Sequence, residues 1–163
     1  MRSRQKGFTL VEMFLAVTVM VLVVAGALTV YLASYSVWQE ASRLAALSRQ
    51  GSIAMEGMVR GIRGTNEARR NGLREAKAFS IPDAATILFT SGVDNIERRF
   101  CLSGGTIIYR CGGGDVIVAR DVDSLTFTRI VNKRIRVGLN LQESFKGKLI
   151  DISLESEILI RNK

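Results

Sequence analysis

A long apolar run near the N-terminus is the strongest pattern in this chain. Residues 13–33 are hydrophobic apart from Thr18, Gly26, Thr29 and Tyr31. As an α-helix, a run of this length covers about 30 Å, the thickness of the hydrocarbon core of a bilayer. The composition after the run is that of a soluble domain. The pattern therefore predicts one membrane span, with the rest of the chain on one side of the membrane.

The apolar pattern continues beyond the run at helical spacing. We call the following series the predicted stripe; apart from Ser48, its members are apolar or glycine: Val37, Ala41, Leu44, Ser48, Gly51, Met55, Met58 and Ile62. This three-four spacing is typical of an amphipathic helix, and no proline occurs before Pro82. We predict one helix from about Phe8 to about Ile62. Glycines weaken its second half by up to ~1 kcal/mol each, so the stripe must pack against something.

Strand patterns replace the helical pattern from about Ala78. A hairpin is expected at residues 95–111, turning at Ser103, Gly104 and Gly105. Further strands are expected at residues 85–91, 115–119, 123–131, 134–142 and 148–161. Every second residue is apolar along the last two strands, at Ile135, Val137, Leu139, Leu141, Ile150, Ile152, Leu154, Ile158 and Ile160. This alternation predicts an antiparallel sheet with one buried face.

The predicted stripe is the natural cover for the buried face of the sheet. The fold class is therefore α+β: a long N-terminal helix, transmembrane in its first half and amphipathic in its second half, packed on an antiparallel β-sheet. We divide the chain into residues 1–7, a span at 8–33, an amphipathic half-helix and linker at 34–72, and a globular β domain at 73–163.

The charge pattern orients the predicted span. The formal net charge of the 163-residue chain is +8, and Arg2, Arg4 and Lys6 contribute three of these charges just before the apolar run. A basic stretch before a span marks the cytoplasmic side, so the globular part is expected outside the cytoplasm. The arginines further along have no interleaved aromatic residues and no nucleic-acid motif, so we interpret them as a solvated basic face.

Composition gives little support to an enzyme. The chain has no histidine, which removes the commonest general base and the commonest metal ligand. The glycine-rich stretch at residues 112–118 has neither the lysine nor the helix pattern of a phosphate-binding loop. Ser103 and Ser124 have no histidine partner for nucleophilic catalysis. We expect no catalytic residues, no metal and no cofactor.

Two cysteines, Cys101 and Cys111, are too few for a zinc site. Outside the cytoplasm they could form one disulfide. If Gly104 and Gly105 form the hairpin turn, however, Cys101 faces Ile108 and Cys111 lies several residues away along the ribbon, which is too far for a bridge. A disulfide would need a longer, irregular loop, and we leave this possibility open.

The N-terminal sequence "KGFTLVEM" combines three features. Gly7 ends the short basic leader, Phe8 begins the span, and Glu12 places a carboxylate inside the apolar run. Together with the uninterrupted span, this resembles the class III signal of type IV pilins and of the pseudopilins of type II secretion. A conventional signal peptide, cut after Ala27, is the alternative, but the apolar run is longer than a usual signal core.

The resemblance implies how the N-terminus is processed. A prepilin peptidase would cut between Gly7 and Phe8 and methylate the new amine of Phe8, giving N-methylphenylalanine. Glycine leaves room for a tight protease site because it has no Cβ. A charge within a bilayer is costly and usually has a partner. For Glu12 the resemblance implies the positive N-terminal amine of a neighbouring subunit, a pairing that would set the axial register of a filament.

A looser resemblance covers residues 95–162. The stretches "IERRFCLSGGTIIYRC", "ARDVDSLTFTRI" and "IRVGLNLQ" are similar to the globular part of PilW-type minor pilins and J-type minor pseudopilins. The chain lacks the acidic cluster with which major pseudopilins bind calcium, so a minor subunit is expected. Its partners would be other pilins or pseudopilins, the prepilin peptidase and the inner-membrane assembly platform.

The function implied is that of a structural subunit of a periplasmic filament or its tip complex, in type II protein secretion or type IV pilus biogenesis. It would be held in the bacterial inner membrane, with its N-terminus cytoplasmic and its globular domain periplasmic, before it enters the filament. The alternative is a competence or adhesion pilus subunit that binds DNA or a surface through its basic globular domain.

Overall fold

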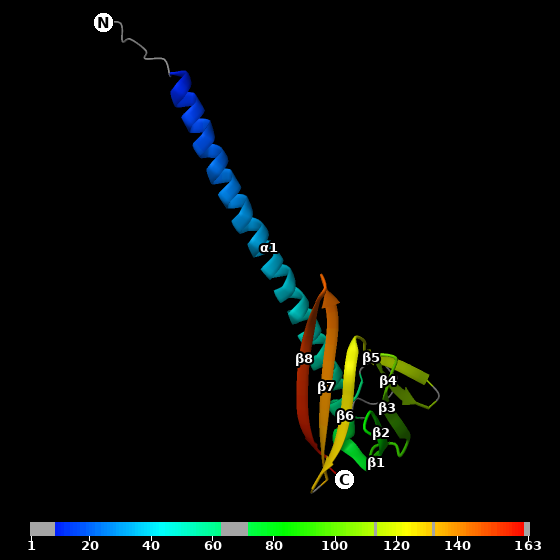
Figure 1. The fold of residues 1–163 in the computed structure, drawn as a ribbon. Coiled ribbons are helices and arrows are strands. Elements are labelled where there is room, and N and C mark those ends of the chain that lie inside the picture. Colours follow the sequence, from blue (N-terminus) through cyan, green and yellow to red (C-terminus); the bar gives the residue numbers. More distant parts are fainter. Residues whose placement is uncertain (1–8, 63–71, 113, 132, 162–163) are drawn as a thin grey trace, which may run out of the picture. The chain divides into compact units, whose positions relative to one another are not determined.

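The computed structural model describes residues 9–62, 72–112, 114–131 and 133–161. The chain forms two compact units, which divide between Ser42 and Arg43. Figure 1 follows the elements of both units along the chain. Among the described residues these elements are one α-helix, a short 3₁₀ helix and eight β-strands. The long apolar helix followed by antiparallel sheets confirms the predicted α+β class.

The helix α1 extends from Leu10 to Arg60, close to the predicted bounds. It ends at a glycine: Gly61 has φ of 100° and its N–H donates to the Gly57 carbonyl at 2.9 Å. This left-handed conformation is the common way to end an α-helix, because glycine has no Cβ to oppose it. The polypeptide then resumes, in the described part, with the 3₁₀ helix η1 (Leu73–Glu75).

The buried face of α1 differs in part from the predicted stripe. Gly51, Met55 and Met58 are buried as expected, whereas Val37, Ala41 and Leu44 are exposed. The residues that the stripe missed are Leu47 and Ala54, both buried. The burial of α1 begins only at Leu47, and from there the 47, 51, 54, 58 spacing follows one face of the helix. The predicted stripe begins too early because only the last turns of α1 are buried.

The first sheet has five antiparallel strands in chain order. They are β1 (Ala76–Asp83), β2 (Thr86–Ser91), β3 (Glu97–Ser103), β4 (Thr106–Cys111) and β5 (Gly114–Ala119). The sequence did not separate β1 as a strand, since it carries Pro82 and its pairing with β2 is irregular between Ser80 and Asp83. Proline is tolerated there because β1 is an edge strand.

The predicted β3–β4 hairpin is confirmed. Ser103 pairs with Thr106 across a turn at Gly104 and Gly105, whose φ angles are 55° and 71°. Positive φ at both central residues is the requirement of a type I′ hairpin turn. The glycines therefore set the register of the hairpin.

The hairpin register also decides the geometry of the cysteines. Cys101 lies opposite Ile108, as predicted, and Cys111 lies opposite Arg98. The two residues are thus offset by about 10 Å along the ribbon, at ~3.3 Å per residue, which exceeds the reach of a disulfide. Both side chains are thiols in the structure, and the disulfide considered from the sequence is not formed.

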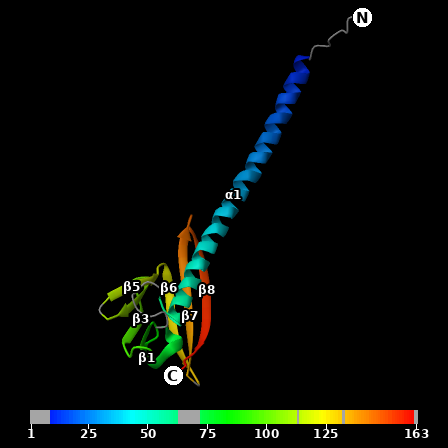
Figure 2. The same cartoon turned by 180° about the vertical axis from the view of Figure 1, so that it is seen from behind.

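The second sheet has three antiparallel strands, β6 (Val122–Ile130), β7 (Arg134–Phe145) and β8 (Lys148–Leu159). The alternation predicted for β7 is confirmed, since its four apolar positions are all buried: Ile135, Val137, Leu139 and Leu141. The last turns of α1 run alongside β7 and β8 in both views (Figure 1 and Figure 2). The helix and this sheet come close at Gly51, which faces Leu141 and Leu154.

The sequence suggested one sheet, whereas the structure has two. The Val122 N–H donates to the Gly105 carbonyl at 3.0 Å, and the Phe127 N–H donates to the Ala84 carbonyl at 2.7 Å. Gly105 and Ala84 lie in turns of the first sheet. Two backbone N–H groups of β6 therefore bind turn carbonyls of the first sheet, and β6 does not pair with an edge strand of that sheet. The two sheets and α1 still share one core, to which they contribute Phe100, Leu125 and Met58.

Candidate functional site

The candidate site lies at the N-terminal end of α1, where Thr9 and Glu12 bind each other. The Glu12 Oε2 atom accepts hydrogen bonds from the Thr9 backbone N–H at 2.9 Å and from the Thr9 hydroxyl at 3.0 Å. In return, the Glu12 backbone N–H donates to Thr9 Oγ1 at 3.3 Å. This reciprocal arrangement is a capping box, which satisfies N–H groups that the first helical turn otherwise leaves without partners.

Of the residues predicted for processing and assembly, the structure places only Glu12. Gly7 and Phe8, the expected cleavage and methylation positions, lie outside the described residues. Glu12 is exposed on the first turn of α1. Both of its hydrogen bonds from Thr9 end on the same oxygen, Oε2.

Thr9 is the residue that the sequence reasoning missed. Its signal was present as the spacing Thr-x-x-Glu directly before an apolar run, which indicates the start of a helix. The structure shows that Glu12 has an intrachain role as well as any role between chains. The carboxylate is oriented by its own helix before another molecule approaches it.

The helix that follows Glu12 is long and apolar enough to cross a membrane. Its large apolar side chains are exposed from Leu10 to Leu44. Two threonine hydroxyl groups inside this segment donate to carbonyls of the same helix: Thr18 to Phe14 at 2.8 Å, and Thr29 to Gly26 at 2.7 Å. Polar groups in lipid need such internal partners because no water is available there. The threonines of this segment therefore present no unbonded hydroxyl hydrogen to their surroundings.

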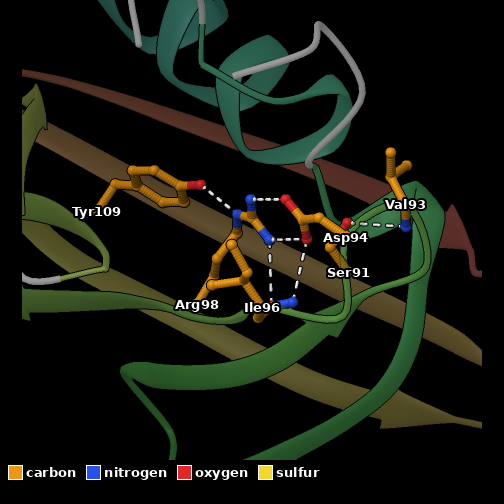
Figure 3. Close-up of polar contacts among 6 residues, drawn as sticks. All are labelled: Ser91, Val93, Asp94, Ile96, Arg98 and Tyr109. Atoms are coloured by element: carbon orange, nitrogen blue, oxygen red, sulfur yellow. Dashed lines mark hydrogen bonds and ion pairs between the residues drawn. The ribbon is translucent and has the colours of Figure 1, made fainter. Parts of the chain in front are cut away.

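The globular unit contains one fully buried charged side chain among the described residues, Arg98 on β3. Its guanidinium donates to the Asp94 carboxylate, with Nη1 at 2.8 Å from Oδ1, and its Nε donates to the Tyr109 hydroxyl at 2.8 Å. Nη1 also donates to the Ile96 carbonyl at 3.1 Å. Figure 3 shows how these groups converge on the guanidinium. Buried charges are tolerated only when they are paired and hydrogen-bonded in this way.

The same network perturbs two ionisable groups. Hydrogen bonding to Arg98 holds the pKa of Asp94 at about 2. Burial raises the pKa of Tyr109 to about 12. Asp94 also accepts a hydrogen bond from the Ile96 N–H at 3.0 Å, which closes the loop between β2 and β3 (Figure 3). Because Arg98, Asp94 and Tyr109 bind one another within this network, we interpret the network as a structural element that fixes this loop.

Several arginines of the globular unit form ion pairs. The arginines that lie within ion-pair distance of a carboxylate, among the described residues, are Arg43, Arg60, Arg98, Arg110, Arg134 and Arg136. Arg110 and Asp115 form a bidentate pair with both distances at 2.6 Å. These pairs reduce the positive charge that remains for an anionic partner. Groups of three or more metal-ligating side chains are absent from the part of the chain that the structure describes.

Comparison with known families adds one match. Residues 2–28 match a family described as the prokaryotic N-terminal methylation motif, which is the class III signal of type IV pilin-like proteins. The match includes Gly7, Phe8, Thr9 and Glu12, together with most of the apolar run. Neither a curated protein nor a solved structure matches the chain. The motif and the apolar helix support a membrane-anchored, pilin-like subunit, and they favour a structural role over an enzymatic one.

Proposed function

We propose that this chain is a minor pilin or minor pseudopilin, a structural subunit of a periplasmic filament or of its tip complex. The observation that carries the proposal is the coincidence of the methylation motif at residues 2–28 with a helix, Leu10–Arg60, whose end packs into a β domain. In this proposal the first part of α1 stores the subunit in the inner membrane, and the same apolar surface later packs among helices in the filament.

Processing at the N-terminus is the first step. Prepilin peptidase cuts between Gly7 and Phe8, and the Phe8 amine is methylated. The new N-terminus then lies one residue before Thr9, the helix cap. A positive amine next to the N-terminal end of a helix is electrostatically unfavourable, so this amine gains from a carboxylate partner.

Glu12 supplies that partner to a neighbouring subunit. Thr9 occupies Oε2 of the Glu12 carboxylate, and we assign Oε1 as the acceptor for the neighbour's Phe8 amine. An ion pair in a low-dielectric filament core is strong only when its groups are well oriented and hydrogen-bonded. The hydrogen bonds from Thr9 provide this orientation.

Mass spectrometry of the chain isolated from cells that contain a prepilin peptidase tests the proposal. We expect loss of residues 1–7 and the addition of one methyl group. Gly7→Val should block the cut, since a branched side chain would obstruct the protease site. An uncut natural chain, or a cut after Ala27, would contradict the proposal.

Association is tested by pull-down of partner subunits with Glu12→Ala. We expect reduced recovery of partners, with Glu40→Ala on the same helix as the matched control. Glu12→Gln separates the two roles, because it keeps an oxygen for Thr9 but loses the charge. Undiminished association of both Glu12 variants would contradict the assigned pairing.

A DNA-binding or surface-binding pilus subunit is the second candidate, and no specific contact in the structure favours it. The arginine–carboxylate pairs described above weaken the basic face on which it depends. Salt-dependent retention on DNA would support it.

A further inference from the structure

Three aromatic side chains follow one another on α1 in the first compact unit, and we call Tyr31, Tyr35 and Trp38 the aromatic ladder. Their spacing of four and three residues places them on one face of the helix. The ring centroids of Tyr31 and Tyr35 are 6.2 Å apart with planes at 13°, and those of Tyr35 and Trp38 are 6.1 Å apart with planes at 25°. The rings therefore form a continuous stack along the helix.

The aromatic ladder begins where the apolar run ends. The sequence has no charged residue from Met13 to Trp38, and Glu40 and Arg43 follow immediately. Tyr31 lies 19 residues after Glu12, or about 28 Å along a helix, which matches the hydrocarbon core of a bilayer. The stretch from Thr9 to Trp38 covers about 43 Å, which matches a bilayer with its headgroups.

The rings are large, exposed and amphipathic. Tyr31 and Trp38 expose 63% and 64% of their surfaces, and Tyr35, between them, exposes 46%. Each has an apolar ring and one polar group, a phenol hydroxyl or an indole N–H. Such side chains prefer the boundary between hydrocarbon and water, where both parts are solvated.

We propose that the aromatic ladder binds the lipid headgroup layer and so sets the depth of α1 in the membrane. The helix then holds Glu12 at the opposite boundary, because the ladder prevents the apolar run from sliding inward or outward. For Glu12 this statement rests on the proposed function, in which its carboxylate must be accessible to a neighbouring subunit's amine. The ladder itself depends only on α1 as a membrane helix.

Lipid suits the aromatic ladder better than a second helix does. Helix–helix contacts in membranes favour small residues that let backbones approach closely, whereas the ladder presents three bulky rings in succession. Polar and charged residues begin directly after it, as expected at a membrane surface. The two length matches above are consistent with a bilayer and have no counterpart in a helix–helix contact.

Trp38 is the only tryptophan of the chain, so it reports its own position. The full chain is reconstituted into vesicles of phosphatidylethanolamine and phosphatidylglycerol that carry a nitroxide quencher at the headgroup, at the upper acyl chain or at the chain end. We expect blue-shifted emission and quenching by the headgroup and upper-chain labels that exceeds quenching by the chain-end label roughly two-fold or more. Water-like emission without quenching would overturn the proposal.

Variants then test whether the ladder sets the depth. In Tyr31→Leu/Tyr35→Leu the α-helix is preserved, because leucine is a good helix former, but the interfacial groups are lost. We expect the preference of Trp38 for shallow quenchers to fall, while Val37→Leu, an aliphatic exchange beside the ladder, leaves it unchanged. Circular dichroism verifies that both variants stay helical. An unchanged quenching profile in the helical double variant would overturn the depth-setting role.

Two further results separate this inference from the proposed function. Blue-shifted emission that appears only after a partner subunit is added, without quenching by the lipid labels, would assign the ladder to a protein contact and overturn the lipid proposal. Cleavage between Gly7 and Phe8 is measured on the same variants. An interfacial Trp38 in a chain that prepilin peptidase does not cut would support the membrane role of the ladder and contradict the proposed function. A cut chain with a water-exposed Trp38 would support the proposed function and contradict the membrane role of the ladder.

Discussion

A Cβ atom on Gly51 would lie 2.5 Å from Leu154 Cδ1 and 2.8 Å from Leu141 Cδ1. Gly51 therefore allows α1 to approach β7 and β8 more closely than any other residue would. Gly57, two turns later on the same helix, has a different environment: its nearest such contacts are Ile62 at 3.7 Å and Val118 at 3.9 Å. The two glycines make a matched pair for measuring what close approach contributes to the fold.

Gly57→Ala should raise the free energy of unfolding by up to about 1 kcal/mol, because alanine is the better helix former and the site has room for it. Gly51→Ala should raise the free energy of unfolding by less, since the added methyl group must displace two leucine side chains. Gly51→Leu should lower the free energy of unfolding by about 1–3 kcal/mol, because the larger side chain overpacks the contact. Urea denaturation of the full chain in mild detergent measures all three. Equal stabilisation by alanine at both positions would contradict the close approach.

Removal of the Arg98 guanidinium should cost about 3 kcal/mol of unfolding free energy, because Asp94 and Tyr109 then lose the partner that satisfies them. Arg98→Met tests this while keeping much of the side-chain volume. Arg136→Met on β7 is the control: its pairs with Glu155 and Glu157 are exposed, so the loss should stay below about 1 kcal/mol. Similar losses in the two variants would show that burial of Arg98 adds nothing.

Acid should weaken the fold through Asp94. The folded state lowers the pKa of Asp94 from 3.8 to about 2, chiefly through its hydrogen bonds with Arg98. A carboxyl group whose pKa is lower in the folded state than in the unfolded state stabilises the fold at pH values above its unfolded-state pKa. This stabilisation is lost as the pH falls through the folded-state pKa. The melting temperature should therefore fall less steeply between about pH 5 and pH 2 for Asp94→Asn than for the natural chain. Parallel curves would contradict this assignment.

Loss of the capping box should loosen the first turn of α1. Thr9→Ala removes the hydroxyl that accepts from the Glu12 N–H and donates to its carboxylate. A cap of this kind contributes about 1 kcal/mol, so amide exchange of Glu12 in detergent micelles should become roughly five-fold faster. Thr9→Ser keeps the hydroxyl and should exchange like the natural chain. No difference between the two variants would show that the cap is dispensable.

The sequence predicted those features that depend on local pattern. The helix bounds follow from an unbroken apolar and amphipathic period, the β3–β4 register follows from Gly104 and Gly105, and the inward residues of β7 follow from strict alternation. These signals are local because a helix, a turn and a strand each satisfy their hydrogen bonds within a few residues or with one neighbour.

Features that depend on distant contacts were less predictable. The predicted stripe included Leu44, since nothing in the sequence marks where the sheet stops covering α1. The division into two sheets depends on donors of β6 that bind turn carbonyls at Gly105 and Ala84. Arg98 was grouped with the solvated arginines, because its burial depends on Tyr109, across the hairpin, and on Asp94 in the preceding loop.

In the candidate site, the family motif identified Glu12, whereas Thr9 was overlooked. The Thr-x-x-Glu spacing indicates a capping box, whereas the resemblance implies a partner for Glu12 on another chain. The structure adds the intrachain partner, and the two interpretations are compatible because they concern different oxygens of one carboxylate in the function that we propose.

The hydroxyl groups of Thr18 and Thr29 have a consequence for the extraction from the bilayer that the proposed function requires. Each donates to a carbonyl of its own helix, so neither needs a lipid, a water or a neighbouring chain to be satisfied. In the function that we propose, the surroundings of Thr18 and Thr29 can therefore change from acyl chains to protein side chains without either of these two hydrogen bonds being broken. If the subunit leaves the bilayer as we propose, these two hydroxyl groups add no hydrogen-bonding cost to its extraction, because each keeps its acceptor within α1.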